Sequence, residues 1–130
     1  MIILTSQEIA QFRSQLATYP EALEALDQIE DCEGDLEDAA ISMAIHAGQT
    51  PTTSENWLDG LAKRFRVKVC HLDYRQDLLE GKITAVVAGL LESKACPELL
   101  VVPVVIYALK TGVEDFCKPL EYKLETSEAD

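Results

Sequence analysis

The chain has 130 residues, 48% of them hydrophobic and 26% charged, which is the composition of an ordinary globular domain large enough to bury its own core. Acidic side chains outnumber basic ones by 23 to 11, so the net charge is −12. Nucleic acid is therefore disfavoured as a partner, because phosphate binding needs clustered lysine and arginine. Most of the net negative charge lies in residues 1–62, which carry 12 acidic and 1 basic side chain, whereas residues 63–130 carry 11 acidic and 10 basic ones.

Two amphipathic helices are predicted at the start of the chain. Thr5 and Glu8 have the spacing of a capping box, and the apolar residues that follow recur at helical intervals. Pro20 disfavours helical geometry in the residue before it, so the first helix must end there. The same proline suits the first turn of a second helix, which Gly34 ends.

Two further helices are expected in the middle of the chain. Asp35 is a suitable N-cap for a third helix, and Gly48 closes it. Ser54 is a suitable N-cap for a fourth. Trp57 begins the strongest apolar stripe in the sequence, so this fourth helix should pack on the core.

The segment 66–74 is ambiguous. Val67 and Val69 alternate with a lysine, a pattern that fits a short strand or an extended connection between helices. Beyond it, a short helix is expected over residues 73–80 and a longer one over residues 83–96.

The stretch Leu99–Leu109 reads LLVVPVVIYAL and carries no charge. It is too short to cross a bilayer, which takes about 20 apolar residues, so we expect it to be buried within the protein. A proline in a central strand would remove a ladder hydrogen bond. We therefore predict a central buried helix that follows Pro97, bends at Pro103 and ends at Gly112.

These elements predict an all-α fold, a compact bundle of six to eight short helices around the central apolar helix. The alternative is an α+β fold in which residues 67–72 pair with one other short strand in a small sheet. Residues 1–120 should form a single helical domain, and residues 121–130 a polar, frayed tail.

The redox state of the four cysteines is predicted from the expected location of the protein. The sequence MIILTSQEI lacks the positive and apolar regions of a signal peptide, so we expect a cytoplasmic protein that does not bind membranes. Thiols stay reduced in the cytoplasm, which predicts free thiols at Cys32, Cys70, Cys96 and Cys117. Their wide spacing contains no CxxC pair and indicates neither a zinc site nor a redox motif.

Two charged clusters are the candidate partner-binding residues. The first is acidic and consists of Glu30, Asp31, Glu33, Asp35, Glu37 and Asp38. Its spacing does not fit a calcium loop, so it is either a solvated turn between helices or a docking surface for a basic partner. The second is basic and consists of Lys63, Arg64, Arg66 and Lys68. It is either a stabilised helix end or a contact with the acidic cluster, in the same chain or in a second copy.

No catalytic or phosphate-binding motif occurs in the sequence, and we expect no catalytic residue, metal or cofactor. The hypothesis that follows is a non-enzymatic acidic interaction or regulatory module that binds a basic protein surface or self-associates, for instance as a homodimer. One alternative is an inhibitor or immunity-type protein that masks a basic partner. Another is a small thiol or metal enzyme that uses Cys70, Cys96 or His46.

Overall fold

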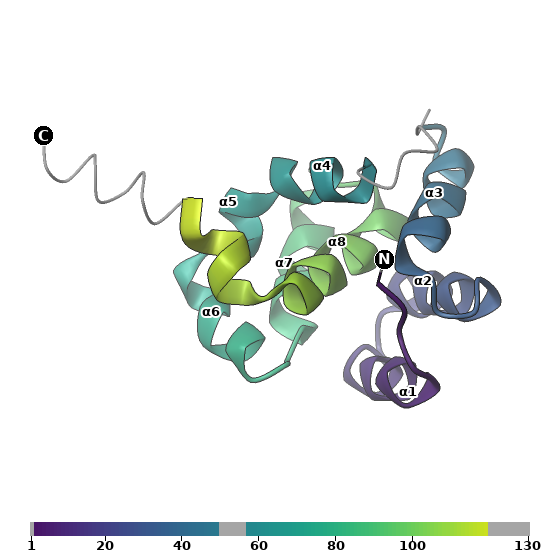
Figure 1. Ribbon diagram of the computed structural model, residues 1–130, viewed down its shortest axis with the longest axis horizontal. Coiled ribbons are helices and arrows are strands. Elements are labelled where there is room, and N and C mark those ends of the chain that lie inside the picture. The colour runs from purple at the N-terminus through teal and green to yellow at the C-terminus, as the bar shows by residue number, and fades with distance from the viewer. Residues whose placement is uncertain (1, 50–56, 120–130) are drawn as a thin grey trace, which may run out of the picture.

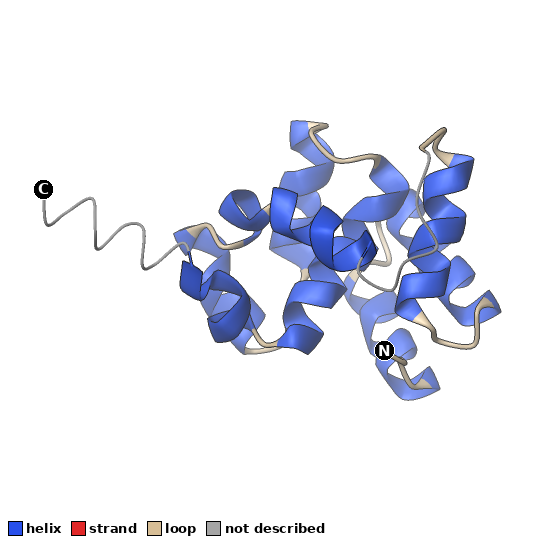
Figure 2. Ribbon diagram, turned by 45° about the horizontal axis from the view of Figure 1, so that its top comes forward, coloured by secondary structure: helices blue, strands red, loops and turns tan. Residues whose placement is uncertain are grey.

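The computed structural model describes residues 2–49 and 57–119, and all the regular elements in them are helices (Figure 1, Figure 2). Eight of these are α1 (Ser6–Gln15), α2 (Pro20–Asp31), α3 (Leu36–His46), α4 (Trp57–Arg64), α5 (Arg66–Val69), α6 (Leu72–Leu79), α7 (Thr84–Ser93) and α8 (Glu98–Thr111). Residues 113–119 add one more helical segment. The predicted all-α bundle is confirmed. Ser54 and residues 120–130 lie outside the described residues.

Helix α8 is the centre of the bundle, as predicted from its uninterrupted apolar sequence. It packs against α2, α3, α4 and α7, and all the residues from Leu100 to Ile106 are buried. A helix enclosed on every side has no polar face, which is why the run carries no charge. The helix begins at Glu98, passes through Pro103 without ending, and ends at Gly112, whose φ of 109° suits glycine.

The α+β alternative is wrong, because residues 66–79 form the two helices α5 and α6 instead of a strand. Val69 is buried while Val67 is exposed, but this difference arises within one helical turn. Cys70 is the C-cap of α5 and His71 is the N-cap of α6, so the chain turns between the two helices here. Within the described residues, the isolated antiparallel bridge between Ile3 and Asp35 is the sole strand-like pairing.

That bridge fastens the N-terminal segment to the turn between α2 and α3. The backbone N–H of Leu4 donates to the carbonyl of Gly34 at 2.8 Å, and the N–H of Leu36 donates to the carbonyl of Ile2 at 3.0 Å. Gly34 has a φ of 85° and lies directly against Leu4. The close packing of the N-terminal segment against this turn therefore requires a residue without a side chain at position 34.

Polar contacts between distant parts of the chain hold α1 against the rest of the bundle. The side-chain amide of Gln15 accepts from the N–H of Ile83 at 2.7 Å and donates to the carbonyl of Gly81 at 3.1 Å. Lys110 donates to the carboxylate of Glu8 at 2.6 Å, which lowers the pKa of that carboxyl group. These contacts join α1 to both α7 and α8.

No helix within residues 2–49 and 57–119 combines the length and apolar character that spanning a membrane requires.

Candidate functional site

The six residues of the acidic cluster are brought together by the end of α2, the turn that follows and the first turn of α3 (Figure 1). We call this surface, with Ile3 beside it, the acidic corner. The structure therefore places all six predicted residues in one compact region. Sequence reasoning did not identify Ile3, which joins them through its bridge to Asp35 and is 49% exposed.

Three of the six carboxylates make contacts within the chain. Asp35 accepts from the backbone N–H of Asp38 at 3.1 Å and so caps α3. Glu37 accepts from the N–H of Ile2 at 3.1 Å. Glu30 pairs with Arg13 at 2.5 Å. These three carboxylates therefore stabilise helix ends and the N-terminal segment.

The other three carboxylates, those of Asp31, Glu33 and Asp38, are exposed and make no ion pair within residues 2–49 and 57–119. The one basic side chain of residues 1–62, Arg13, already contacts Asp27 at 2.7 Å as well as Glu30. This half of the chain therefore supplies no further lysine or arginine side chain to neutralise them. Within the described residues the outcome is a local surface of negative charge without ion-pair partners.

The residues of the basic cluster are not joined to the acidic corner by any ion pair that the described residues make. Lys63 bonds to Asp59 at 2.8 Å along α4, and the guanidinium of Arg66 lies 5.1 Å from the centre of the Phe116 ring. Arg64 and Lys68 are exposed. The contact predicted within one chain is thus not formed in this part of the structure. Lys63 and Arg64 lie in the last turn of α4, in agreement with the interpretation of the cluster as a stabilised helix end.

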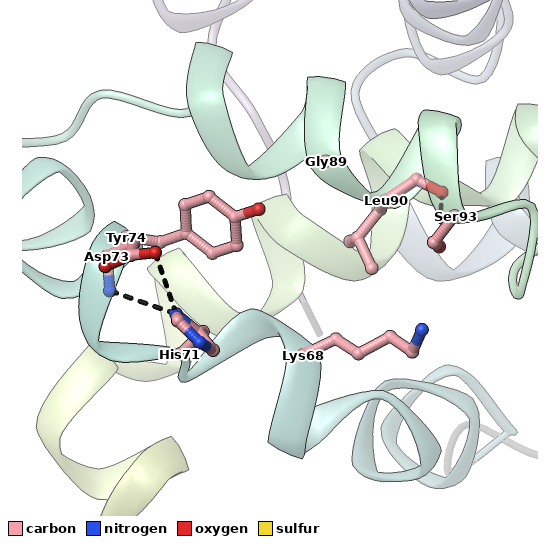
Figure 3. A pocket seen from close by; sticks show the side chains of 7 residues that line it. All are labelled: Lys68, His71, Asp73, Tyr74, Gly89, Leu90 and Ser93. Carbon is pink, nitrogen blue, oxygen red and sulfur yellow. Dashed lines mark hydrogen bonds and ion pairs between the residues drawn. The ribbon is translucent and has the colours of Figure 1, made fainter.

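Lys68 lies at the edge of an open pocket of about 270 Å³ between α5, α6 and α7, which we call the α5–α7 pocket. Figure 3 shows Lys68 and His71 on one side and Leu90 and Ser93 on the other. The Nδ1 atom of His71 accepts from the backbone N–H of Asp73 at 3.1 Å, so in neutral His71 the proton lies on Nε2. Asp73 and Tyr74 also line the pocket, and the Asp73 carboxylate lies 3.5 Å from His71 Nδ1. The pocket thus combines one lysine ammonium group, one carboxylate, an imidazole and the side chain of Leu90.

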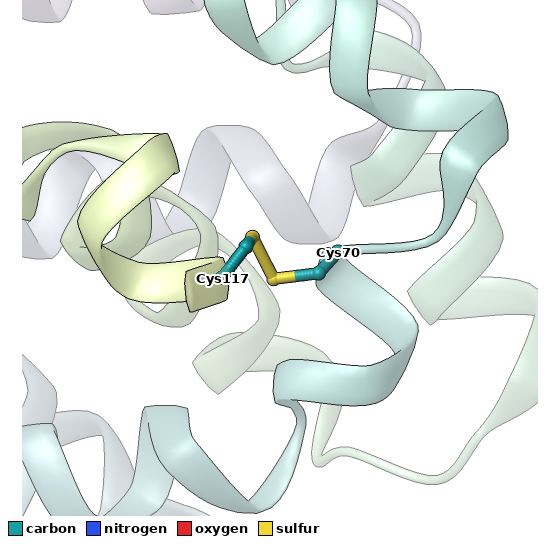
Figure 4. The surroundings of a disulfide bond; sticks show 2 residues. All are labelled: Cys70 and Cys117. Atoms are coloured by element: carbon teal, nitrogen blue, oxygen red, sulfur yellow. A yellow bond between two sulfur atoms is a disulfide. The ribbon is translucent and has the colours of Figure 1, made fainter. Parts of the chain in front are cut away.

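The prediction of four free thiols is wrong, because Cys70 and Cys117 form a disulfide (Figure 4). Their Cα atoms lie 5.7 Å apart, and the bond joins the end of α5 to the helical segment 113–119. Both residues are buried. The pairing removes Cys70 from the thiols that the enzyme alternative required. No local spacing signals it, since the two cysteines are 47 positions apart.

Cys32 and Cys96 are free and differ in their surroundings. Burial raises the pKa of the Cys96 thiol to about 12. The pKa of Cys32 is also raised, first by burial and then by the carboxylates of Asp38, Asp35 and Asp31. Both shifts reduce the fraction of reactive thiolate at neutral pH. His46 bonds to the carbonyl of Ser42 at 2.9 Å and is exposed on α3.

We expect the negative charge of the acidic corner to slow the reaction of Cys32 with anionic thiol reagents. The measured quantity is the rate of reaction with dianionic dithiobis(nitrobenzoate) divided by the rate with neutral dithiodipyridine. This ratio should be at least about fivefold lower for Cys32 in the folded chain than for Cys32 in the urea-unfolded chain. The thiolate fraction cancels in this ratio, because both reagents consume the same thiolate. Mass spectrometry of the labelled peptides separates Cys32 from Cys96.

Salt provides the control for this measurement. At about 1 M salt the Debye length falls to about 3 Å, so the ratio should approach that of the unfolded chain. Cys96 should react slowly with both reagents, because it is 2% exposed. Equal ratios for Cys32 in the folded and unfolded chain at low salt would show that the corner carries no effective negative potential.

Comparison with models of protein families, with curated proteins and with solved structures finds no match to this chain in any of the three. Functional inference therefore rests on its own charges, contacts and exposed surfaces.

Proposed function

We propose that this protein is a non-enzymatic interaction or regulatory module whose acidic corner binds a basic surface of a protein partner. The observation that carries the proposal is the set of three exposed carboxylates without a cation partner in the described residues, those of Asp31, Glu33 and Asp38. They lie in the half of the chain whose one basic side chain is already engaged by other carboxylates.

Three physical properties of the corner support binding to a protein rather than mere solubility. Its negative potential would attract a basic surface and speed the encounter. Ile3 then offers an apolar contact at the edge of the charges, and such contacts lose their water on binding and hold the complex together. The capped start of α3 and the paired N-terminal segment keep the corner in one shape, which lowers the entropy lost on association.

Charge reversal at the corner tests the proposal. The variant Asp31→Lys with Glu33→Lys should lose at least about tenfold in affinity for any partner captured by the wild-type chain, because both attractive contacts become repulsive. The matched control is Glu92→Lys with Glu114→Lys, which changes the net charge equally at two exposed positions far from the corner in sequence.

The partner is obtained by affinity capture from the native cell extract and elution with rising salt, and its affinity for each variant is then measured with the purified proteins. We expect a partner with a basic surface, eluted by salt, retained by the control variant and lost by the corner variant. A partner that binds the corner variant and the control equally, or the absence of any salt-sensitive partner, would refute the proposal.

A further inference from the structure

We propose that the disulfide between Cys70 and Cys117 is a redox switch, whose reduction by a dithiol reductant releases the helical segment 113–119 while the rest of the bundle stays folded. This switch is independent of the acidic corner and of its proposed partner. The disulfide joins two short helical elements that lie together at one end of the molecule (Figure 1, Figure 4).

The two joined elements are too short to be stable by themselves. Helix α5 has 4 residues, and the other element spans only residues 113–119. Isolated helices shorter than about 12 residues are marginal in water, so each element depends on its packing. In α5 the buried side chain is Val69, and in the segment 113–119 the buried side chains are Val113, Phe116 and Cys117. With so few buried contacts on each side, the covalent bond is a large part of what joins them.

The centre of the core lies elsewhere in the bundle. Helix α8 packs against α2, α3, α4 and α7, and its residues 100–106 are buried. Neither Cys70 nor Cys117 lies in any of these five helices. A peripheral unit with few buried contacts can open at a lower free energy than the global unfolding of the protein. Release of the segment 113–119 is therefore expected to be a local event.

The ring of Phe116 makes the main non-covalent contacts of the segment. It meets the ring of Tyr107 edge-on, with centroids 6.5 Å apart, and the guanidinium of Arg66 lies 5.1 Å from its centre. Contacts of these kinds are individually weak. Once the covalent bond is broken they can separate, and the reduced chain then exposes the apolar side chains of Phe116, Val113 and Val69.

The reaction is a two-electron exchange of thiols and disulfide. Cys70 is 3% and Cys117 1% exposed, so the reductant reaches the bond when the segment opens locally. One thiolate of the reductant attacks a sulfur of the bond, forms a mixed disulfide and releases the other cysteine, which takes up a proton. The second thiolate of the reductant then displaces and releases the second cysteine, which is protonated in turn. The protein gains two thiols, and the reductant becomes a disulfide.

The two free cysteines are poor nucleophiles for this bond. Cys96 is buried, which raises the pKa of its thiol to about 12. Burial and nearby carboxylates also raise the pKa of Cys32. Both thiols therefore carry little thiolate at neutral pH, so rearrangement of the disulfide within the chain is slow. The bond changes by exchange with an external dithiol.

The resistance of the bond to reduction distinguishes a switch from a structural cross-link. If the reduced chain kept Cys70 and Cys117 packed together, their high effective concentration would favour the disulfide strongly. If reduction releases the segment, the effective concentration falls and the bond becomes easier to reduce. A switch should therefore exchange reversibly with a protein dithiol such as thioredoxin.

A redox titration tests this reversibility. The variant Cys32→Ala with Cys96→Ala retains only the two paired cysteines, and it is equilibrated without denaturant against equal concentrations of reduced and oxidised thioredoxin. We expect at least about 10% of the chain to be reduced, whether the starting protein is oxidised or reduced, and the wild-type chain to give the same fraction. Alkylation and mass spectrometry count the thiols. A smaller reduced fraction would identify a structural cross-link and overturn the inference.

Cleavage by chymotrypsin separates release of the segment from unfolding of the whole bundle. The measured quantity is the rate of cleavage after Phe116 divided by the rate after Phe12. Phe12 is a matched residue in α1, 6% exposed against 4% for Phe116. In the variant Cys70→Ala with Cys117→Ala this ratio should be at least about tenfold higher than in unstructured peptides of the same sequences, because Phe116 lies in the part that opens.

The oxidised wild-type chain is the control for this ratio and should show no such excess, because the disulfide holds Phe116 in place. A ratio in the variant equal to that in the peptides would mean that loss of the bond unfolds the bundle as a whole. An equal excess in the oxidised chain would mean that the segment opens without reduction. Either result would overturn the inference.

Discussion

Replacing both Cys70 and Cys117 by alanine is expected to lower the free energy of unfolding by about 4 kcal/mol. The disulfide joins residues 47 positions apart, and a cross-link over a loop of that length removes about 4 kcal/mol of conformational entropy from the unfolded chain in the loop-closure model. Urea denaturation of the purified, oxidised protein measures the difference. The m-value should rise as well, because the unfolded chain without the cross-link exposes more surface.

Reductant and a second cysteine provide the controls. The wild-type chain should lose about the same stability in the presence of a thiol reductant, whereas the double variant should be unaffected by it. Cys96→Ala removes an equally buried cysteine that forms no disulfide, and should cost only about 1 kcal/mol. A wild-type stability that does not respond to reductant, together with four titratable thiols in the unfolded protein, would show that the bond does not form.

Gly34→Ala is expected to destabilise the protein by roughly 3 kcal/mol. A Cβ atom at this position would lie 2.2 Å from the carbonyl oxygen of Leu4, and the backbone φ of 85° is itself unfavourable for alanine. The N-terminal segment would have to move away, which breaks its two backbone hydrogen bonds to the turn and exposes the buried side chain of Leu4. Urea denaturation gives the loss, and amide exchange at Leu4 should speed up.

Gly48→Ala separates the clash from the backbone strain. Gly48 has nearly the same φ, 79°, but nothing lies within 4 Å of the Cβ atom that alanine would add. It should therefore lose only about 1 kcal/mol, the cost of the left-handed conformation. Equal losses at the two glycines would mean that the contact between the N-terminal segment and the turn contributes nothing to stability.

The helix ends near the start of the chain and around α8 could be predicted because they depend on neighbours a few residues away. Thr5 and Glu8 form the capping box that their spacing predicts, and Asp35 caps α3. Gly112 ends α8 with a positive φ. Each of these signals acts over one helical turn, so the sequence contains both partners of the interaction within four residues.

The segment 66–74 could not be assigned because its local pattern is too short. Two valines separated by one residue fit a strand as well as a helical turn, and periodicity decides only over longer stretches. In the structure Val69 packs in the core, and the disulfide at Cys70 and the ring of Phe116 beside Arg66 hold the neighbouring helical turns in place. Cys117 and Phe116 both lie in the helical segment 113–119, more than 40 positions away in the chain.

The amino-acid sequence by itself determined the all-α class, the central place of the apolar helix and the position of the acidic cluster, because these follow from hydrophobic patterning and charge counted along the chain. Tertiary structure alone decided which two cysteines pair, that Ile3 joins the acidic corner, and that Lys68 and His71 line one pocket with Leu90. The physical reason is distance in the chain. Contacts within a helical turn are encoded by adjacent residues, whereas a disulfide, a bridge or a pocket depends on how whole helices pack.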